Sequence, residues 1–183
     1  MTAQRSLRAR ALQWLAQREQ SRVELRRKLL PYALAEAETQ AEAEAKPREG
    51  ADVTPAAALL ATPAARVDAL LDWLEAHRYL SSERFVEARV HARVARFGNA
   101  RIRHELKQHQ VALSPSAAQL LADSESARAC AVRERKFPQP PASVAERARQ
   151  ARFLAGRGFS ADAITHALRA ARDDEDAAER SAD

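Results

Sequence analysis

The sequence predicts an all-α protein, built as a tandem array of three-helix repeats (three copies) with helix-turn-helix-like corners. Composition is the first observation: hydrophobic residues make up 46% of the 183 residues, aromatic residues only 5%, and the chain holds four glycines. Alanine-rich chains of this kind favour helices packed through small side chains over sheets. The second observation is a recurring corner, in which Ser21, Gly98 or Ser160 precedes large aliphatic residues at helical spacing.

The three corners align without gaps. The aligned patterns are Ser21-x3-Leu25-x3-Leu29, Gly98-x3-Ile102-x3-Leu106 and Ser160-x3-Ile164-x3-Leu168. We interpret each as two helices around a corner, with a third helix closing the triangle.

The first repeat is expected over residues 6–78. A helix over residues 6–20 is followed at once by a capping box, in which the Ser21 hydroxyl accepts from the Glu24 amide and the Glu24 carboxylate reaches back. Two helices joined in this way form a corner, because the capping serine needs non-helical dihedral angles. Pro31 predicts an early end of the second helix, since proline cannot donate its backbone hydrogen bond.

Residues 33–62 interrupt this repeat. They are rich in alanine and glutamate and lack apolar periodicity, which predicts a solvated, partly disordered insertion whose acidic, alanine-rich portion could be transiently helical. Thr62 and Pro63 then form a cap followed by proline at the first helical position. The helix that they begin has an apolar face with Val67, Leu70, Leu71 and Leu74, and should end near His77.

The second repeat is expected over residues 79–122. Ser81 and Ser82 are good N-cap residues for a helix that ends at Gly98 and Asn99. That helix carries two apolar stripes, which are Phe85, Ala88 and Ala92, and Val86, Val90, Val94 and Phe97. The next helix has Ile102 and Leu106 inward, and a closing helix runs from about residue 114 to 121.

The third repeat is expected over residues 123–172. It lacks a closing helix unless the tail supplies one or the helix expected over about residues 124–136 belongs to it, and the sequence leaves this choice open; that helix has Ala127, Ala131 and Val132 as weak anchors. A second capping box, with Ser143 and Glu146, begins the next helix, and Ser160 caps the last one. The acidic tail, residues 173–183, has nothing to bury and should be frayed or disordered.

No catalytic constellation is recognisable. The five histidines are scattered, the single cysteine has no partner for a metal cluster, and the glycines fall at turns rather than in a phosphate-binding loop. We therefore expect no enzyme activity, no cofactor and no metal. No apolar run approaches the ~20 residues of a membrane span, and no signal-peptide segment is present, so a cytoplasmic protein is the default.

Basic residues carry the functional signal. The formal net charge is +5, and cations recur near all three corners with few acids in the same helices. A solvated helix face would be the simplest interpretation, but repeated like charge favours a polyanion or an acidic protein surface as partner. The candidate binding residues are Arg22, Arg26, Arg27, Lys28, Arg101, Arg103, Lys107, Arg149, Arg152 and Arg157.

Two other functions fit the same pattern. A helix corner followed by a basic helix is typical of an autonomous helix-turn-helix reader of duplex DNA. The candidate helices offer little Asn, Gln or Ser for base edges, which favours phosphate contacts over sequence readout. The other alternative is a helical adaptor for an acidic protein, with no dependence on nucleic acid.

Four stretches resemble the RecX family of bacterial regulators of the RecA recombinase. They are SRVELRRKL (21–29), YLSSERF (79–85), GNARIRHEL (98–106) and FLAGRGFS (153–160), and they occur in the family's order over nearly the whole chain. The insertion at 33–62 and the Pro31-Tyr32 pair, where a glycine turn would be usual, depart from the family pattern.

The resemblance implies an elongated, all-helical, non-enzymatic protein that lies in the groove of the RecA–single-stranded DNA filament. Such a protein would obstruct strand exchange, filament extension, ATP hydrolysis and co-protease activity. Its partners would be the RecA filament and the phosphate backbone of single-stranded DNA. We expect the protein to be a monomer and not to bind a membrane.

Overall fold

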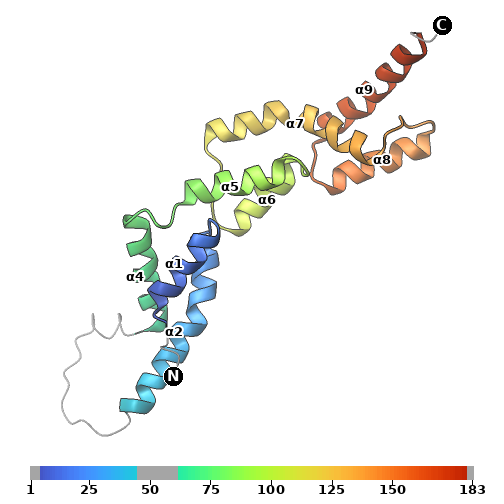
Figure 1. The fold of residues 1–183 in the computed structure, drawn as a ribbon. Helices are drawn as coiled ribbons and strands as arrows, with labels where there is room; N and C mark the ends of the chain where they lie inside the picture. Colours follow the sequence, from blue (N-terminus) through green and yellow to red (C-terminus); the bar gives the residue numbers. More distant parts are fainter. Residues whose placement is uncertain (1–4, 45–61, 181–183) are drawn as a thin grey trace. The chain divides into compact units, whose positions relative to one another are not determined.

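The computed structural model describes residues 5–44 and 62–180, and every regular element in these ranges is an α-helix, as predicted (Figure 1). Compact packing divides the chain into two units, Met1–Phe85 and Val86–Asp183. The helices are α1 (Leu7–Gln17), α2 (Arg22–Glu44), α4 (Pro63–Ala76), α5 (Ser82–Val94), α6 (Asn99–Gln108), α7 (Pro115–Lys136), α8 (Val144–Gly156) and α9 (Ala161–Arg180). None of the helices in these ranges combines the length and the hydrophobicity needed to cross a membrane.

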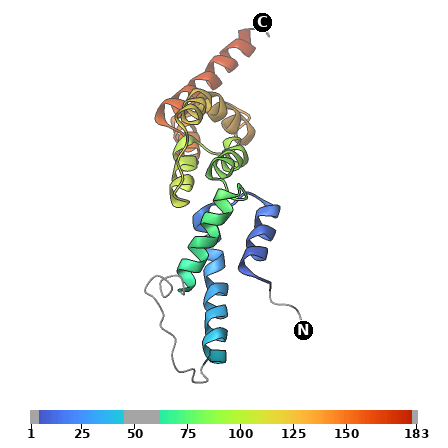
Figure 2. The same ribbon diagram turned by 90° about the vertical axis from the view of Figure 1, so that its left-hand side faces the viewer.

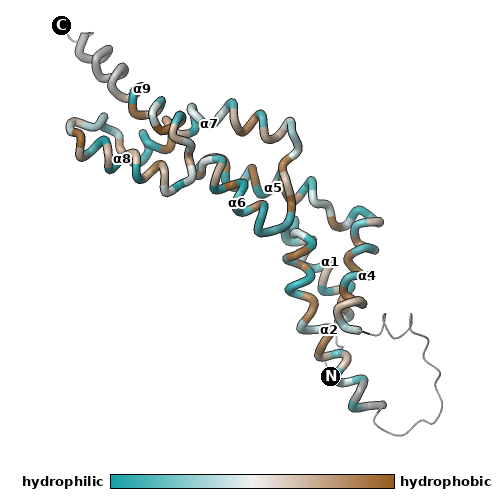
Figure 3. The backbone as a smooth tube through the Cα atoms, turned by 180° about the vertical axis from the view of Figure 1, so that it is seen from behind, coloured by the Kyte–Doolittle hydropathy of each residue, from teal (hydrophilic) through white to brown (hydrophobic). Residues whose placement is uncertain are grey.

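The first unit is a packed arrangement of α1, α2 and α4. Helices α2 and α4 lie side by side in Figures 1 and 2, and α1 packs against α2. Leu25 and Leu29 of α2 meet Val67, Leu71 and Leu74 of α4 in a fully buried core. Hydrophobic residues alternate with hydrophilic ones along both helices, as the brown and teal segments of Figure 3 show. Because the hydrophobic residues recur at helical spacing, they lie on one face of each helix, and this face is in the core.

Helix α2 is longer than predicted. The expectation that Pro31 ends it early is wrong, because the helix continues to Glu44. The Pro31 side chain is exposed, whereas Ala33, two residues on, is fully buried in the core. Glu36 further ties the second half of α2 to α4 by accepting a hydrogen bond of 3.0 Å from Arg66. Residues 33–44 are thus helical rather than the start of a solvated insertion, and the rest of the predicted insertion, 45–61, lies outside the described residues.

Helix α7 is one continuous helix where the sequence predicted two. Ser114 caps its start by accepting from the amide of Ala117 at 3.2 Å. Ser124, expected near the start of a second helix, instead donates its hydroxyl to the carbonyl of Leu120 at 2.8 Å. A serine inside a helix can bond back to the preceding turn in this way, so its presence alone does not mark a boundary.

Several alanines predicted to face inward are exposed. Ala88 and Ala92 of α5 and Ala127 and Ala131 of α7 all face solvent. In the second unit the core is instead formed by α7, α8 and α9, with the residues Ala129, Val132, Leu154, Phe159, Ala163 and Ala167. Alanine carries little hydrophobic driving force, so its spacing identifies a buried face poorly.

Helix α9 extends through Arg180, so residues 173–180 are helical rather than frayed. Ala167, Leu168 and Ala171 anchor the earlier part of the helix by burial. Once a helix is nucleated, each added residue gains a backbone hydrogen bond, and the alanines, glutamates and arginine of this segment favour that conformation.

The three aligned corners share one backbone hydrogen bond. The amide of the first inward residue donates to the carbonyl of the capping residue in each: Leu25 to Ser21, Ile102 to Gly98 and Ile164 to Ser160, at 3.0, 3.3 and 3.0 Å. The helix after each corner therefore begins with the bond that is usual at a helix start. The caps differ, because the Ser21 and Ser160 hydroxyls also accept from the amides of Glu24 and Ala163, whereas Gly98 makes no side-chain cap bond. The number and the boundaries of the repeats stay a prediction.

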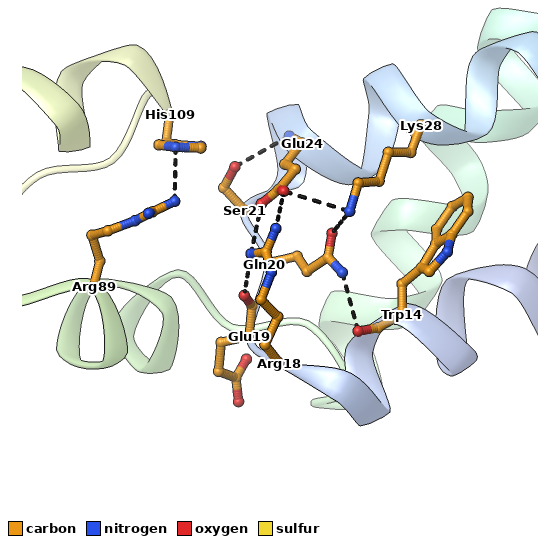
Figure 4. Close-up of polar contacts among 9 residues, drawn as sticks. All are labelled: Trp14, Arg18, Glu19, Gln20, Ser21, Glu24, Lys28, Arg89 and His109. Atoms are coloured by element: carbon orange, nitrogen blue, oxygen red, sulfur yellow. Dashed lines mark hydrogen bonds and ion pairs between the residues drawn. The ribbon is translucent and has the colours of Figure 1, made fainter. Parts of the chain in front are cut away.

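A buried carboxylate holds the first corner (Figure 4). The Ser21 hydroxyl accepts from the Glu24 amide at 3.1 Å, as the capping box predicted. The Glu24 carboxylate binds the guanidinium of Arg18 through both oxygens, and Lys28 lies 3.5 Å from it. Gln20 completes the cluster by accepting from Lys28 at 2.8 Å and donating to the Trp14 carbonyl at 3.0 Å. Burial alone would raise the pKa of Glu24, but Arg18 and then Lys28 outweigh it and lower the pKa below its ordinary value.

The second and third corners are bonded to each other through their backbones. The amide of Gly98 donates to the carbonyl of Arg157 at 3.0 Å, and that of Ala100 donates to Gly158 at 3.1 Å. A Cβ atom at Gly98 would lie 2.2 Å from the Gly158 oxygen. Gly158 itself has a φ of 82°, where glycine has no steric penalty. The two corners therefore approach more closely than any other pair of residues would allow.

A polar cluster from α7 supports this junction. Glu125 accepts from the Asn99 amide at 2.7 Å, and the Asn99 side chain donates to the Leu121 carbonyl at 2.9 Å. Arg128 donates to the carbonyl of Phe97 at 2.9 Å and to Asn99 Oδ1 at 2.5 Å. Burial lowers the pKa of Arg128, an effect that Glu125 partly opposes. The cluster thus supplies partners for polar groups between the end of α5 and the start of α6.

Replacement of Gly98 by alanine should destabilise the second unit. The added methyl group must push apart two hydrogen-bonded backbones, and overpacking of this kind costs about 1–3 kcal/mol. Gly156→Ala is the matched control, because a Cβ atom there meets nothing within 4 Å and alanine favours the helix by about 0.5–1 kcal/mol. Urea unfolding followed by far-UV circular dichroism measures both, and a Gly98→Ala protein as stable as the wild type would contradict the junction.

Replacement of Glu24 by glutamine should destabilise the first unit at neutral pH by about 1–2 kcal/mol, because the charge-assisted bonds to Arg18 are lost. The pKa of Glu24 is lowered by folding, so its contribution is present above its unfolded pKa of about 4.3 and is lost as the pH falls through the folded value. The difference between variant and wild type should therefore shrink from pH 7 to pH 3.

Urea unfolding by tryptophan fluorescence measures this effect, because both tryptophans, Trp14 and Trp73, lie in the first unit. The matched control is Glu38→Gln on the exposed side of α2, which should change stability by less than about 0.5 kcal/mol. A difference between Glu24→Gln and wild type that stays constant across the pH range would refute the lowered pKa.

Candidate nucleic-acid interface

The predicted cations of the first corner are largely neutralised within their own unit. Arg22 lies 2.7 Å from Asp72 and 2.8 Å from Glu75. Burial would lower the pKa of Arg22, but these two carboxylates raise it. Arg26 forms a two-pronged contact with Asp68, with Nε–Oδ1 and Nη2–Oδ2 distances of 2.7 and 3.1 Å. All three acids come from α4, so this helix compensates the basic face of α2.

The remaining two cations of the first corner differ from each other. Lys28 belongs to the Glu24 cluster and lies over the ring of Trp14, 5.4 Å from its centroid. Arg27 is exposed. Of the four candidates at this corner, Arg27 is therefore the cation that the structure leaves most open to a partner.

The predicted cations of the second corner are exposed. Arg101 lies 3.7 Å from Glu105, and its guanidinium carbon lies 5.4 Å from the centroid of Phe97. Arg103 and Lys107 line a hollow of about 490 Å³ whose apolar wall includes Leu106, and whose other lining residues are Gln110, Val111, Ala112, Leu113 and Ala118. An apolar hollow with a cationic rim suits an acidic protein surface better than a nucleic acid, because it offers apolar contact beside charge.

The predicted cations of the third corner lie along α8. Arg152 is exposed, and Arg149 places its guanidinium 5.5 Å from the ring of Phe137. Arg157 is half-buried, lies 4.5 Å from the ring of Phe153 and donates to the carbonyl of Arg96 at 3.2 Å. The position of Arg157 is thus fixed by the contact between the second and third corners.

The structure brings the second and third corners together around Phe97. The guanidinium carbons of four arginines lie within 6 Å of its ring centroid, and these are Arg93, Arg96, Arg101 and Arg157. Arg93 is neutralised by Glu105 at 2.9 Å. Arg101 also lies 3.7 Å from Glu105. Arg96 and Arg157 keep cation–π contacts with the ring and form no ion pair with a described carboxylate.

A basic hollow of about 230 Å³ lies beside this ring. Its lining residues are Arg96, Val132, Arg135, Lys136, Phe153 and Arg157. Four of the six are cations and none is an acid. We call this the α7–α8 hollow. Among the described pockets it has the most lining cations without an acid, a composition that suits an anionic group such as phosphate.

Sequence reasoning missed three of these four cations. Arg96 lies between Val94 and Phe97 of the predicted apolar stripe. Arg135 and Lys136 lie in the last turn of α7, away from any corner. The available signal was the basic last turn, since cations gather at helix C-termini for electrostatic reasons. The same signal is ambiguous, because cations in a last turn can simply stabilise the helix rather than bind a partner.

Histidines do not form a site in the part of the chain that the structure describes. His109 lies 3.2 Å from Arg89 through its Nε2 atom (Figure 4), and arginine can only donate in this contact. Within the same ranges, no group of three or more His, Cys, Asp or Glu residues could hold a metal ion.

Comparison with known proteins gives consistent results. A model of the third three-helix domain of RecX matches residues 123–168, which contain the second part of α7, all of α8 and the first part of α9. The regulatory protein RecX of Ralstonia nicotianae is 45% identical over 169 residues, which cover 91% of this chain and 88% of the relative.

Two further relatives span almost the whole chain. RecX of Herbaspirillum seropedicae is 44% identical over 93% of this chain and 94% of its own length. RecX of Neisseria meningitidis is 34% identical over 95% of this chain and 96% of its own length. Identity at this level over nearly full length confirms what the four sequence stretches predicted: the chain belongs to the RecX family of regulatory proteins.

Proposed function

We propose that this protein is a non-enzymatic negative regulator of homologous recombination and DNA repair. It binds the filament that RecA forms on single-stranded DNA and inhibits RecA's ATPase, strand exchange and co-protease activities. It acts in the cytoplasm as a monomer and needs no cofactor. The observation that carries the proposal is similarity to proteins named regulatory protein RecX over about nine-tenths of the chain.

The charges of the second unit support this function. A filament of protein and DNA offers both acidic protein surface and phosphates, and the second unit carries a surface suited to each. The hollow beside Arg103 and Lys107 combines apolar wall and cationic rim, as a protein partner would require. The α7–α8 hollow offers cations without acids, as a phosphate would require.

An autonomous helix-turn-helix reader of duplex DNA fits less well. Such a reader places amide side chains of its recognition helix against base edges. Asn99, at the start of α6, is buried and its side chain is bonded to Leu121 and Arg128. The helix therefore has little to read a base sequence with. A purely protein-binding adaptor fits less well too, because it gives no role to the α7–α8 hollow.

An ATPase titration tests the proposal. RecA hydrolyses ATP on single-stranded DNA, and the full-length protein added below the RecA concentration should inhibit this activity, because a bound regulator blocks more of a filament than its own footprint. The measurement is repeated at two salt concentrations, since ionic contacts weaken as salt rises. Unchanged ATPase and strand exchange would reject the function, and equal binding to bare duplex would favour the helix-turn-helix alternative.

Charge reversal in the second corner should weaken the inhibition. The double variant Arg103→Glu/Lys107→Glu replaces two exposed cations at the rim of the apolar hollow, so we expect roughly a tenfold higher half-inhibitory concentration, or about 1.4 kcal/mol. Arg101 is left intact because it packs against Gly158 and Phe97.

The matched control is Arg147→Glu/Arg169→Glu, which makes the same change in net charge in α8 and α9 at two positions outside the candidate binding residues. Both doubles should keep their helix content and change stability by less than about 0.5 kcal/mol per site. If the two double variants inhibit the RecA ATPase equally, the contact with the protein partner lies elsewhere.

A further inference from the structure

We propose that the α7–α8 hollow is a single-stranded nucleic-acid site, in which Arg96, Arg135, Lys136 and Arg157 hold backbone phosphates and the neighbouring phenylalanines stack on unpaired bases. The inference rests on the proposed function, because it assigns the DNA contact of that function to one surface.

The charge of the hollow is the first argument. Its four cations come from three segments, which are the end of α5, the last turn of α7 and the end of α8. None of its lining residues is an acid, so the positive charges repel each other unless an anion enters. Arg22 and Arg26, in contrast, each have a carboxylate within 3 Å. The protein thus neutralises its cations in one place and leaves them open in another.

Arg157 supplies the second argument. One end of its guanidinium is aimed by the bond from Nη1 to the Arg96 carbonyl. Its Nε atom is buried and has no hydrogen-bond partner among the described residues. A guanidinium with unused donors beside a basic hollow is arranged to bind a phosphate, since arginine matches the geometry of two phosphate oxygens.

Adjacent aromatic rings distinguish a single strand from other phosphates. Lys136 also lines a neighbouring hollow of about 210 Å³, together with Phe137 and Arg149. Phe137 and Phe153 meet edge to face with centroids 5.2 Å apart, and each lies beside an arginine. The two hollows therefore share Lys136, and their linings together combine cations with two aromatic rings, with Glu146 as an acid in the second hollow.

A combination of this kind is what single-strand binding requires. Cations follow the backbone, and aromatic rings stack on bases, which contributes about 1–3 kcal/mol per base. Bases inside a duplex are already stacked and offer no free face. A free polyphosphate has no base to stack, so it would use the cations but not the rings.

The test compares two double variants of the full-length protein. Arg135→Gln/Lys136→Gln removes two cations of the hollow, and Arg147→Gln/Arg169→Gln removes two cations of α8 and α9 that neither line it nor belong to the candidate binding residues. Glutamine is used because glutamate would oppose the dipole at the end of α7. Binding of a labelled thymidine oligonucleotide of about 20 nucleotides is followed by fluorescence anisotropy between about 50 and 200 mM salt.

The hollow variant should bind roughly tenfold more weakly at low salt, and the slope of log K against log salt should fall by about 1.4, because each lost phosphate contact contributes about 0.7. The control should bind within about twofold of the wild type, since charges away from a site act weakly. Circular dichroism checks that both remain helical. Equal binding by the two doubles overturns the inference.

Further ligands identify the source of the phosphate. An abasic oligonucleotide of the same length should bind more weakly than thymidine, and a duplex should bind no better than the single strand. A duplex that binds more tightly, an abasic strand that binds equally well, or complete displacement by millimolar pyrophosphate would each overturn the single-strand site. RecA inhibition by the wild-type protein is measured separately. If the wild type does not inhibit RecA, the proposed function is rejected, but the oligonucleotide result still stands.

Discussion

The contact between the backbones of Gly98 and Gly158 is the constraint on which the second unit depends. The second corner donates two backbone hydrogen bonds there to carbonyls of the third, with no side chain between them, so neither corner can shift without breaking these bonds. The contact fixes Arg157 against Arg96, and it places Phe97 among guanidinium groups from both corners. The α7–α8 hollow is a consequence of this geometry, because its walls come from helices that the junction holds together.

The cost of such a junction lies in the polar groups that it removes from water. The end of α5 and the start of α6 would leave carbonyls and amides without partners, and Arg128, Glu125 and Asn99 supply these. Burial lowers the pKa of Arg128, which shows that its charge is held at a penalty. That penalty is offset because its donors reach several carbonyls at once. A fully satisfied cluster of this kind specifies one arrangement of the corner rather than many.

Local features were predictable from the sequence, and long-range pairs were not. The caps at Ser21, Gly98 and Ser160 depend on a few adjacent residues, so their spacing sufficed to locate the corners and the inward residues beyond them. Pro31 misled because the buried face of α2 outweighed the loss of one hydrogen bond on its exposed side. The neutralisation of Arg22 by α4 joins residues far apart in the chain, which periodicity within one helix does not report.

Each corner starts its second helix with the same backbone bond, yet the corners differ in how much of their positive charge is neutralised, and the difference comes from the helix that packs beside each. Helix α4 brings Asp68, Asp72 and Glu75 to the first corner and neutralises it. Helix α7 brings Arg135 and Lys136 to the third and adds to its charge. A corner of this kind can therefore serve as a structural joint or as a binding surface. Its neighbour decides which, because a cation is available to a partner only where no carboxylate of the same fold reaches it first.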